Sequence, residues 1–146
     1  MTKPFSSLTT EEQSEFVGKL ISAFYTIMTN MKIYHWSTDY YSRHVSSDNF
    51  GITVQPLFDR FFEVLFGHFP QAKQTLLAYE QVGIAISRHT ENITNIKQDP
   101  MYQMLEDFKK FMQSLDLQFG GMTDLLNIRD EITGLVKQTQ YLFGFK

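Results

Sequence analysis

Four ionisable side chains form two pairs, each with the spacing of one helical turn. His44 and Asp48 are four residues apart, Asp59 and Glu63 repeat that interval, and eleven residues separate the two aspartates. Residues four apart lie on one face of an α-helix, so each pair can present two ligand atoms in one direction. The pattern therefore indicates two halves of a metal site.

The two halves cannot meet within one straight helix. Asp48 and Asp59 would lie about 16 Å apart at a rise of about 1.5 Å per residue, which exceeds any shared coordination sphere. A second chain related by a two-fold axis can bring its own carboxylate pair to the His44 and Asp48 of the first, and symmetry then creates a second identical site. The spacing predicts a homodimer with two metal sites.

The composition limits the chemistry that is open to this chain. Its 146 residues suit one domain, over residues 1–146, and 42% hydrophobic residues are ample for a packed core. The chain contains no cysteine, which excludes disulfides, thiolate metal sites and cysteine nucleophiles. Any metal must be held by nitrogen and oxygen ligands, which suit iron, manganese or zinc.

Charge and hydropathy favour a soluble protein without affinity for nucleic acid. The formal net charge is −3 and there is no lysine-rich tail, whereas binding to nucleic acid depends mainly on many Lys and Arg contacts to phosphate. No run of about 18 apolar residues occurs, so no membrane span is expected. Residues 1–10 have no apolar stretch either, and no targeting segment is predicted.

Helical periodicity predicts two helices in the first half of the chain. Two overlapping capping-box frames, formed by Thr9-Thr10 and Glu12-Gln13, open a helix that reaches about Trp36. Residues 37–43 are polar and rich in tyrosine, and we expect a loop there. The apolar residues of the first helix recur at three-to-four spacing, at Phe16, Leu20, Phe24, Ile27, Met28 and Met31.

The second helix is predicted from about His44 to Phe69. Gly51 and Pro56 complicate it, because an interior proline removes a backbone hydrogen bond and collides with the preceding turn. We therefore expect a kink or a short break. Its phenylalanines surround more than one face, which fits a dimer interface as well as a core. They are Phe58, Phe61, Phe62, Phe66 and Phe69.

The second half of the chain is predicted to be a long connection followed by two helices. Residues 70–99 have a mixed pattern with room for one short helix. A third helix begins at Pro100 and ends at Gly120-Gly121, and a fourth is capped by Thr123 and ends at Gly144. The sum is an all-α fold, a four-helix bundle with a long crossover between helices two and three, for which the ferritin-like plan is the natural candidate.

The ligand pattern resembles the signature of a known family. In Dps-like miniferritins a Lys-x-x-His-Trp motif ends the first helix, and ligands follow at intervals of four, eleven and four residues. This chain has Met31-Lys32-Ile33-Tyr34-His35-Trp36, followed by His44, Asp48, Asp59 and Glu63. The segment from Asp124 to Glu131 also resembles small ferritin-like proteins of unknown function that large DNA viruses encode.

The resemblance implies a function and assigns site residues. Hydrogen peroxide or oxygen would oxidise ferrous to ferric iron, and a twelve-subunit shell would store the mineral. The protein would be a ferroxidase-type oxidoreductase that protects against oxidative stress in the cytoplasm or in a virion. One subunit would supply His35, His44 and Asp48, and its two-fold partner would supply Asp59 and Glu63.

Trp36 has two interpretations. By the resemblance, its indole would shield the iron site and supply or quench an oxidising equivalent. Alternatively, an indole at a helix end packs its large apolar area and uses its N–H group as a polar handle.

Other functions remain open at this point. Glu106, Asp107, Asp130 and Glu131 could form a di-iron site inside the bundle, but such sites use two Glu-x-x-His motifs and the chain has none. Manganese or zinc could be held for stability alone. A degenerate ferritin-like bundle, including a viral one, could serve as a structural or interaction protein. His68 and His89 lack partners at ligand spacing and are expected to be ordinary surface or loop residues.

Overall fold

All regular secondary structure in the described part of the chain is helical. The computed structural model describes residues 3–73, 82–87 and 90–145, and no β-strand occurs among them. This confirms the all-α prediction. The long helices are α1 (Thr10–Ser37), α2 (Tyr41–His68), α5 (Pro100–Ser114) and α7 (Thr123–Leu142). The short ones are η1 (Phe5–Ser7), α3 (Pro70–Lys73), η2 (Ile96–Gln98) and α6 (Asp116–Phe119).

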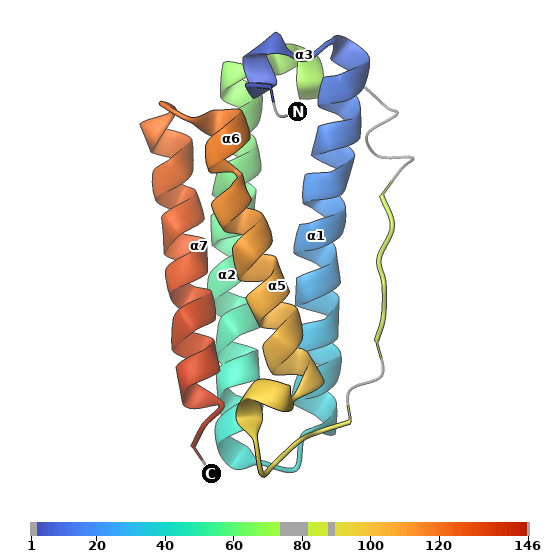
Figure 1. Cartoon of the computed structure of the whole chain (residues 1–146), viewed down its shortest axis with the longest axis vertical. Coiled ribbons are helices and arrows are strands. Elements are labelled where there is room, and N and C mark those ends of the chain that lie inside the picture. Colours follow the sequence, from blue (N-terminus) through green and yellow to red (C-terminus); the bar gives the residue numbers. More distant parts are fainter. Residues whose placement is uncertain (1–2, 74–81, 88–89, 146) are drawn as a thin grey trace.

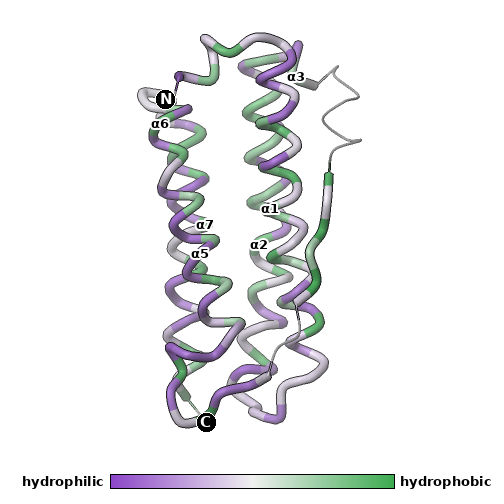
Figure 2. The backbone as a smooth tube through the Cα atoms, turned by 45° about the vertical axis from the view of Figure 1, so that its right-hand side comes forward, coloured by the Kyte–Doolittle hydropathy of each residue, from purple (hydrophilic) through white to green (hydrophobic). Residues whose placement is uncertain are grey.

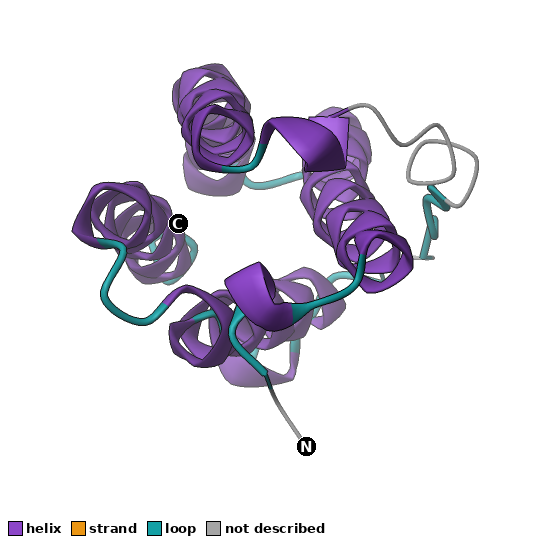
Figure 3. Cartoon of the chain, turned by 90° about the horizontal axis from the view of Figure 1, so that it is seen from above, coloured by secondary structure: helices purple, strands orange, loops and turns teal. Residues whose placement is uncertain are grey.

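The long helices run side by side along the long axis of the molecule (Figures 1 and 3). α1 contacts α2, α2 contacts α7, α7 contacts α5, and α5 contacts α1. Each of them therefore packs against two neighbours around a shared interior. None of the described helices has the length and apolar character that would let it cross a membrane.

Aromatic side chains fill the centre of this interior. Phe24 of α1 is stacked on Phe58 of α2, with ring centroids 4.1 Å apart, and its edge contacts reach Phe61 and Phe108. Within the phenylalanine-rich stretch, Phe58 and Phe61 are buried, whereas Phe62, Phe66 and Phe69 are half-buried at the edge of the core. The stretch thus contributes to the core.

The start of α1 follows the predicted capping chemistry. Thr9 Oγ1 accepts a hydrogen bond from the Glu12 backbone N–H at 3.1 Å, and Glu12 Oε1 accepts one from the Thr9 N–H at 2.9 Å. Both are N–H groups that have no partner inside the helix. The helix extends to Ser37, one residue beyond the predicted end.

The second helix differs from its prediction at two points. α2 begins at Tyr41 rather than His44, so only residues 38–40 form the turn after α1. It also continues unbroken through Gly51 and Pro56, and the predicted break is wrong. Pro56 lies on the exposed side of α2 together with Ile52, so water can hydrate the Ile52 carbonyl that would otherwise accept the missing bond.

The third predicted helix is divided at Leu115 into α5 and α6. Arg129 of α7 explains the division, because its Nη1 donates to the backbone oxygen of Met112 at 2.9 Å and its Nη2 donates to Asp116 Oδ1 at 2.8 Å. The guanidinium therefore satisfies a carbonyl at the C-terminus of α5, where a cation is favoured.

The turn before α7 also departs from the sequence prediction. Thr123 is the first helical residue and Met122 occupies the cap position without a side-chain hydrogen bond, so Thr123 is not the cap. Gly121 has a φ of 86°, a conformation that glycine adopts without steric cost. The long connection between α2 and α5 occurs as predicted, as residues 69–99, and it contains α3 and η2 in the described part.

Candidate metal-binding site

His35 and His44 meet where α1 turns into α2. His35 lies in the last turn of α1 and His44 in the first turn of α2, and the three-residue turn brings the helix ends together. Their imidazole rings are stacked, with centroids 4.0 Å apart and an interplanar angle of 20°. The structure therefore unites the two histidines that the sequence singled out.

Reciprocal hydrogen bonds to the backbone orient both rings. His35 Nδ1 lies 2.7 Å from the backbone oxygen of His44, and His44 Nδ1 lies 2.9 Å from the backbone oxygen of His35. A carbonyl oxygen can only accept, so we infer that both Nδ1 atoms carry the hydrogen. In the neutral rings the lone pair then lies on Nε2, the arrangement that supports metal-ligating histidines.

Asp48 provides the carboxylate nearest to this pair. Its Oδ1 lies 3.9 Å from His35 Nε2 and 3.7 Å from Lys32 Nζ. The Lys32 and Asp48 side chains are 52% and 43% exposed, so their ion pair adds only about 0–1 kcal/mol to stability. A cation that bound Asp48 could therefore displace the lysine at little cost.

Trp36 lies on the surface beside these groups. It is 70% exposed, so its indole is not packed within the described chain. Lys32 Nζ lies 5.8 Å from the centroid of its ring, a cation–π contact. The packing interpretation of Trp36 thus needs a surface that the single chain does not supply.

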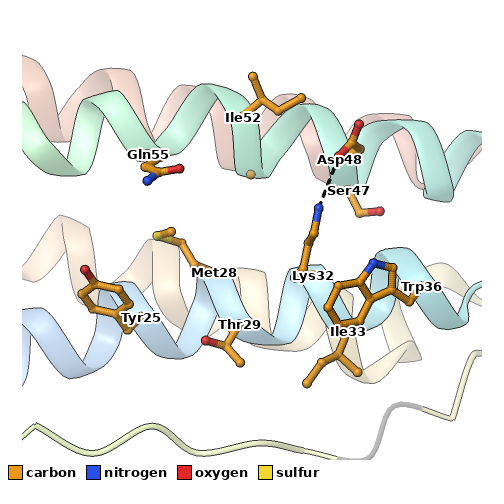
Figure 4. Close-up of a pocket in the computed structure, with 11 residues that line it drawn as sticks. Tyr25, Met28, Thr29, Lys32, Ile33, Trp36, Ser47, Asp48, Ile52 and Gln55 are labelled. Carbon is orange, nitrogen blue, oxygen red and sulfur yellow. Dashed lines mark ion pairs between the residues drawn. The ribbon is translucent and has the colours of Figure 1, made fainter.

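A groove of about 560 Å³ runs between α1 and α2 next to the histidines (Figure 4). Asp48 and Lys32 face each other across it, and apolar side chains cover most of the remaining wall. It is lined by Tyr25, Met28, Thr29, Lys32, Ile33, Trp36, Ser47, Asp48, Gly51, Ile52 and Gln55.

Asp59 and Glu63 stay apart from the histidines in the single chain. Both are exposed on α2, and Asp59 lies about 16 Å along the helix from Asp48 at the helical rise. Within the described ranges, neither carboxylate makes an ion pair or a side-chain hydrogen bond. No three His, Asp or Glu side chains of residues 3–73, 82–87 and 90–145 converge closely enough to hold a metal ion. One chain therefore presents the two predicted halves of the metal site at separate places.

A buried polar network lies behind the histidine pair, and sequence reasoning missed it. Tyr34 and Asp99 are 1% and 0% exposed, and both contact the Arg43 guanidinium. Arg43 Nη1 lies 3.2 Å from the Tyr34 hydroxyl oxygen, 3.3 Å from Asp99 Oδ2 and 3.3 Å from Glu91 Oε1. Arg43 Nε donates to the backbone oxygen of Phe143 at 3.1 Å.

Through Arg43, this network joins the end of α1, the crossover at Glu91, the start of α5 and the end of α7. Asp99 also caps α5, because its Oδ1 accepts from the Met101 N–H at 2.9 Å, and Thr38 donates to Glu91. Burial of the phenol, followed by the charge of Asp99, raises the pKa of Tyr34 well above its ordinary value. The only sequence signal was the Asp99-Pro100 helix start, which does not reveal the distant arginine.

Comparison with protein families places the chain among relatives. The model of a family of unknown function, DUF5856, matches residues 35–143. The chain belongs to this family. The DUF5856 match includes all six predicted site residues, since it begins at His35 and covers the whole of α2. No curated protein and no solved structure matches the chain.

The remaining candidates of this DUF5856 chain lie elsewhere. His68, at the end of α2, contacts Asp124 Oδ2 at 2.7 Å, and this hydrogen bond lowers the pKa of Asp124. His68 is a surface residue, as predicted, while His89 falls outside the described residues. Three of the four acidic residues of the di-iron alternative form ion pairs with basic neighbours: Glu106 with Lys109, Asp130 with Arg129, and Glu131 with Arg60.

Proposed function

We propose that this DUF5856 chain is a Dps-like miniferritin, which binds ferrous iron between two subunits, oxidises it and stores the product. The observation that carries the proposal is the reciprocal hydrogen bonding of His35 and His44. It leaves the Nε2 atoms of both rings free of the backbone contacts, and that of His35 lies 3.9 Å from the Asp48 carboxylate.

The arrangement of the helices supports the ferritin-like part of the proposal. Ferritin-like folds are four-helix bundles with one long crossover connection. Here the long helices pack side by side, and the longest connection, residues 69–99, joins the second of them to the third.

The chemistry of the donors supports a site that two chains share. Two imidazoles and one carboxylate from one chain, with the partner's Asp59 and Glu63, form a nitrogen and oxygen set that suits ferrous iron, and manganese or zinc as competitors. Asp59 and Glu63 are exposed, which a ligand donated to another chain requires. A two-fold axis would create two such sites in a dimer.

The groove between α1 and α2 is the proposed contact surface. Trp36 and Ile52 at its rim are 70% and 67% exposed, and a partner helix lying there would remove this apolar area from water. Six such dimers could close into the twelve-subunit shell that the resemblance implies.

Iron enters this proposal as the substrate. Hydrogen peroxide takes one electron from each of two ferrous ions, its O–O bond breaks, and two ferric ions and two hydroxide ions result. The residues of the chain hold the ferrous ions and the carboxylates balance their charge. Comparison of oxidation rates with peroxide and with oxygen identifies the oxidant.

Isosteric removal of the donated carboxylates tests the site. We expect the wild-type protein to bind ferrous iron with a fixed stoichiometry in anaerobic calorimetry. The double variant Asp59→Asn, Glu63→Gln should lose at least about tenfold in affinity. The matched control is Glu11→Gln, Glu15→Gln, which removes the same charge at the far end of α1 and should bind like the wild type.

Mixing two defective variants tests whether the site is shared. His44→Ala chains and Asp59→Asn, Glu63→Gln chains should each fail alone. After subunit exchange, half of the dimers are mixed and each regenerates one intact site, so about a quarter of wild-type binding should return. No recovery after demonstrated exchange would place both halves within one subunit and overturn the shared site.

The second candidate function is a structural or interaction protein that kept the fold without the metal. It is favoured by the absence of any three-residue ligand group within the described part of one chain. It predicts no change in melting temperature on adding ferrous iron, whereas specific binding must stabilise the folded state.

A further inference from the structure

A row of polar side chains on α1 binds part of the crossover between α2 and α5. Ser22, Thr26 and Asn30, each one helical turn from the next, form hydrogen bonds with every second residue of the segment 82–87. Gly83 N donates to Ser22 Oγ at 2.9 Å, Ala85 N to Thr26 Oγ1 at 3.4 Å, Asn30 Nδ2 to the Ala85 oxygen at 2.7 Å, and Ser87 N to Asn30 Oδ1 at 3.0 Å.

The spacing of these bonds requires an extended segment. Ser22 and Asn30 are eight residues apart, which corresponds to about 12 Å along a helix. Gly83 and Ser87 are four residues apart, which corresponds to about 13 Å in an extended chain. The two lengths match, and the segment runs straight along α1 in Figure 1.

The extended conformation decides which backbone groups face the solvent. Successive residues of an extended chain direct their N–H and C=O groups to opposite sides. Because residues 83, 85 and 87 bond to α1, those of Ile84 and Ile86 face away from it. Within the described residues, no hydrogen bond uses the backbone groups of Ile84 or Ile86.

This outer edge has the character of a strand that pairs with another chain. Ile84 and Ile86 are 48% and 66% exposed, and Figure 2 shows much of the segment in the green of hydrophobic residues on the outside of the molecule. Residues 82–87 contain no charge and no proline. Proteins normally protect such an edge with charges or proline, and strand addition uses it when it is left open.

We propose that two copies of this chain pair through residues 83–87 as an antiparallel two-stranded sheet, with Ala85 on the two-fold axis. The sequence Gly-Ile-Ala-Ile-Ser is nearly palindromic in residue size, so the edge is complementary to itself. Ile84 of one chain then exchanges both backbone hydrogen bonds with the partner's Ile86, and the reverse pair does the same.

The charge and the side chains of the segment select a second copy as the occupant. An uncharged segment meets no like-charge repulsion from its own copy. In this register, the two isoleucines of each chain lie on one face of the sheet and pack as cross-strand pairs. Two short strands bury less area than a standard interface, so the association is weak and depends on concentration.

This contact is separate from the proposed metal dimer. In Figure 4 the segment runs on the side of α1 opposite to α2, whereas the groove and Asp48 lie between α1 and α2. One molecule could use both surfaces at once, and the strand pairing would then link metal dimers into larger assemblies.

Cysteine trapping tests the pairing, because the chain contains no cysteine of its own. In the proposed register Ala85 faces the partner's Ala85 as a non-hydrogen-bonded pair, with Cα atoms about 4.5 Å apart, which a disulfide can span. Under mild oxidation Ala85→Cys should therefore form a covalent dimer. Gln113→Cys, an exposed position on α5, controls for random collision.

A mixed pair of variants tests the direction of the strands. Gly83 would face the partner's Ser87, so Gly83→Cys mixed with Ser87→Cys should cross-link, while each alone should not. A side chain at Gly83 meets no atom within 4 Å, so this variant should fold. Adding Ile84→Lys to Ala85→Cys should reduce cross-linking at least about fivefold, because the charge disfavours the apolar pair.

Three outcomes would overturn the proposal. Ala85→Cys could cross-link no faster than Gln113→Cys, Gly83→Cys and Ser87→Cys could each cross-link alone, or Ile84→Lys could have no effect. Adding Asp59→Asn and Glu63→Gln to Ala85→Cys should leave the cross-link intact. That result would show that the strand pairing does not depend on the metal ligands, whatever the outcome of the iron-binding experiments.

Discussion

Tyr34 shows how a single buried residue supports the stacked histidines near it. Its ring stacks on Phe143 at a centroid distance of 5.3 Å, and its hydroxyl contacts Arg43, Asp99 and Glu91. Ionisation of Tyr34 would place a third negative charge beside the Asp99 and Glu91 carboxylates, at a position where the phenol is only 1% exposed. The neutral phenol is therefore part of what holds the end of α1, and so His35, in place.

The raised pKa of Tyr34 predicts a loss of stability at alkaline pH. The folded pKa lies above the ordinary value of 10.0, so only the unfolded chain releases this proton as pH rises above 10. The contribution of Tyr34 to the free energy of unfolding is fully present below that pH. It decreases above that pH, with a slope that approaches about 1.4 kcal/mol per pH unit. Tyr34→Phe should therefore show a shallower decline than the wild type in urea denaturation between pH 10 and 12. Tyr141→Phe, at a 68% exposed position, should keep the wild-type slope, and equal slopes for all three proteins would refute the argument.

Helix α2 shows how an element can override the preference of one residue. Its 28 residues pack against both α1 and α7, and this packing keeps the helix continuous through Pro56. The proline is placed where its missing N–H is least harmful, on the exposed side. Continuity matters for the candidate site, because it fixes the separation between Asp48 and Asp59 along one axis.

Replacement of that proline should stabilise the protein. Pro56→Ala restores a backbone N–H in the interior of α2, and we expect the free energy of unfolding to rise by about 1–3 kcal/mol. Gln55→Ala, at the exposed neighbouring position, should change it by less than about 0.5 kcal/mol. Chemical denaturation measures both. A loss of stability in Pro56→Ala would mean that the proline shapes α2 in a way the packing requires.

At the scale of the whole molecule, the aromatic core connects helices that are far apart in sequence. Phe24 contacts Phe58 of α2 and Phe108 of α5, so three helices share one buried ring. The single domain over residues 1–146 stays a prediction, and cooperative unfolding is the property that would support it.

Truncation of the Phe24 side chain should lower the free energy of unfolding of all the helices together. Phe24→Ala removes a side chain that is 1% exposed, and we expect a loss of about 3–5 kcal/mol because the cavity is enclosed by other rings. Near-ultraviolet and far-ultraviolet circular dichroism should report the same lowered midpoint. Phe145→Ala, at a 51% exposed position, should have little effect. Two separate transitions would show that the helices do not form one cooperative unit.

Sequence patterns with a short range predicted most of the elements. The Thr9–Glu12 capping box, the helical stripes and the start of α5 at Pro100 depend on residues within one or two turns, and the structure has them where expected. Four candidate ligands were found from their spacing and His35 from the Lys-x-x-His-Trp motif, and two of the five, His35 and His44, do meet. Their function stays a prediction.

The errors lie where residues distant in sequence determine the local structure. The division at Leu115 depends on Arg129, fourteen residues later, and the α1–α2 turn depends on Arg43 and Asp99. The continuity of α2 depends on its neighbours. No local pattern reveals a contact between such positions.

The sequence by itself determined where most of the helices lie and which side chains are candidates for binding a metal, because both follow from residue type and short-range patterns. Only the tertiary structure decided that the two histidines stack with their Nε2 atoms available, that Asp59 and Glu63 remain apart from them, and that residues 82–87 lie along α1. These outcomes depend on how separate helices pack, which is a property of the whole chain.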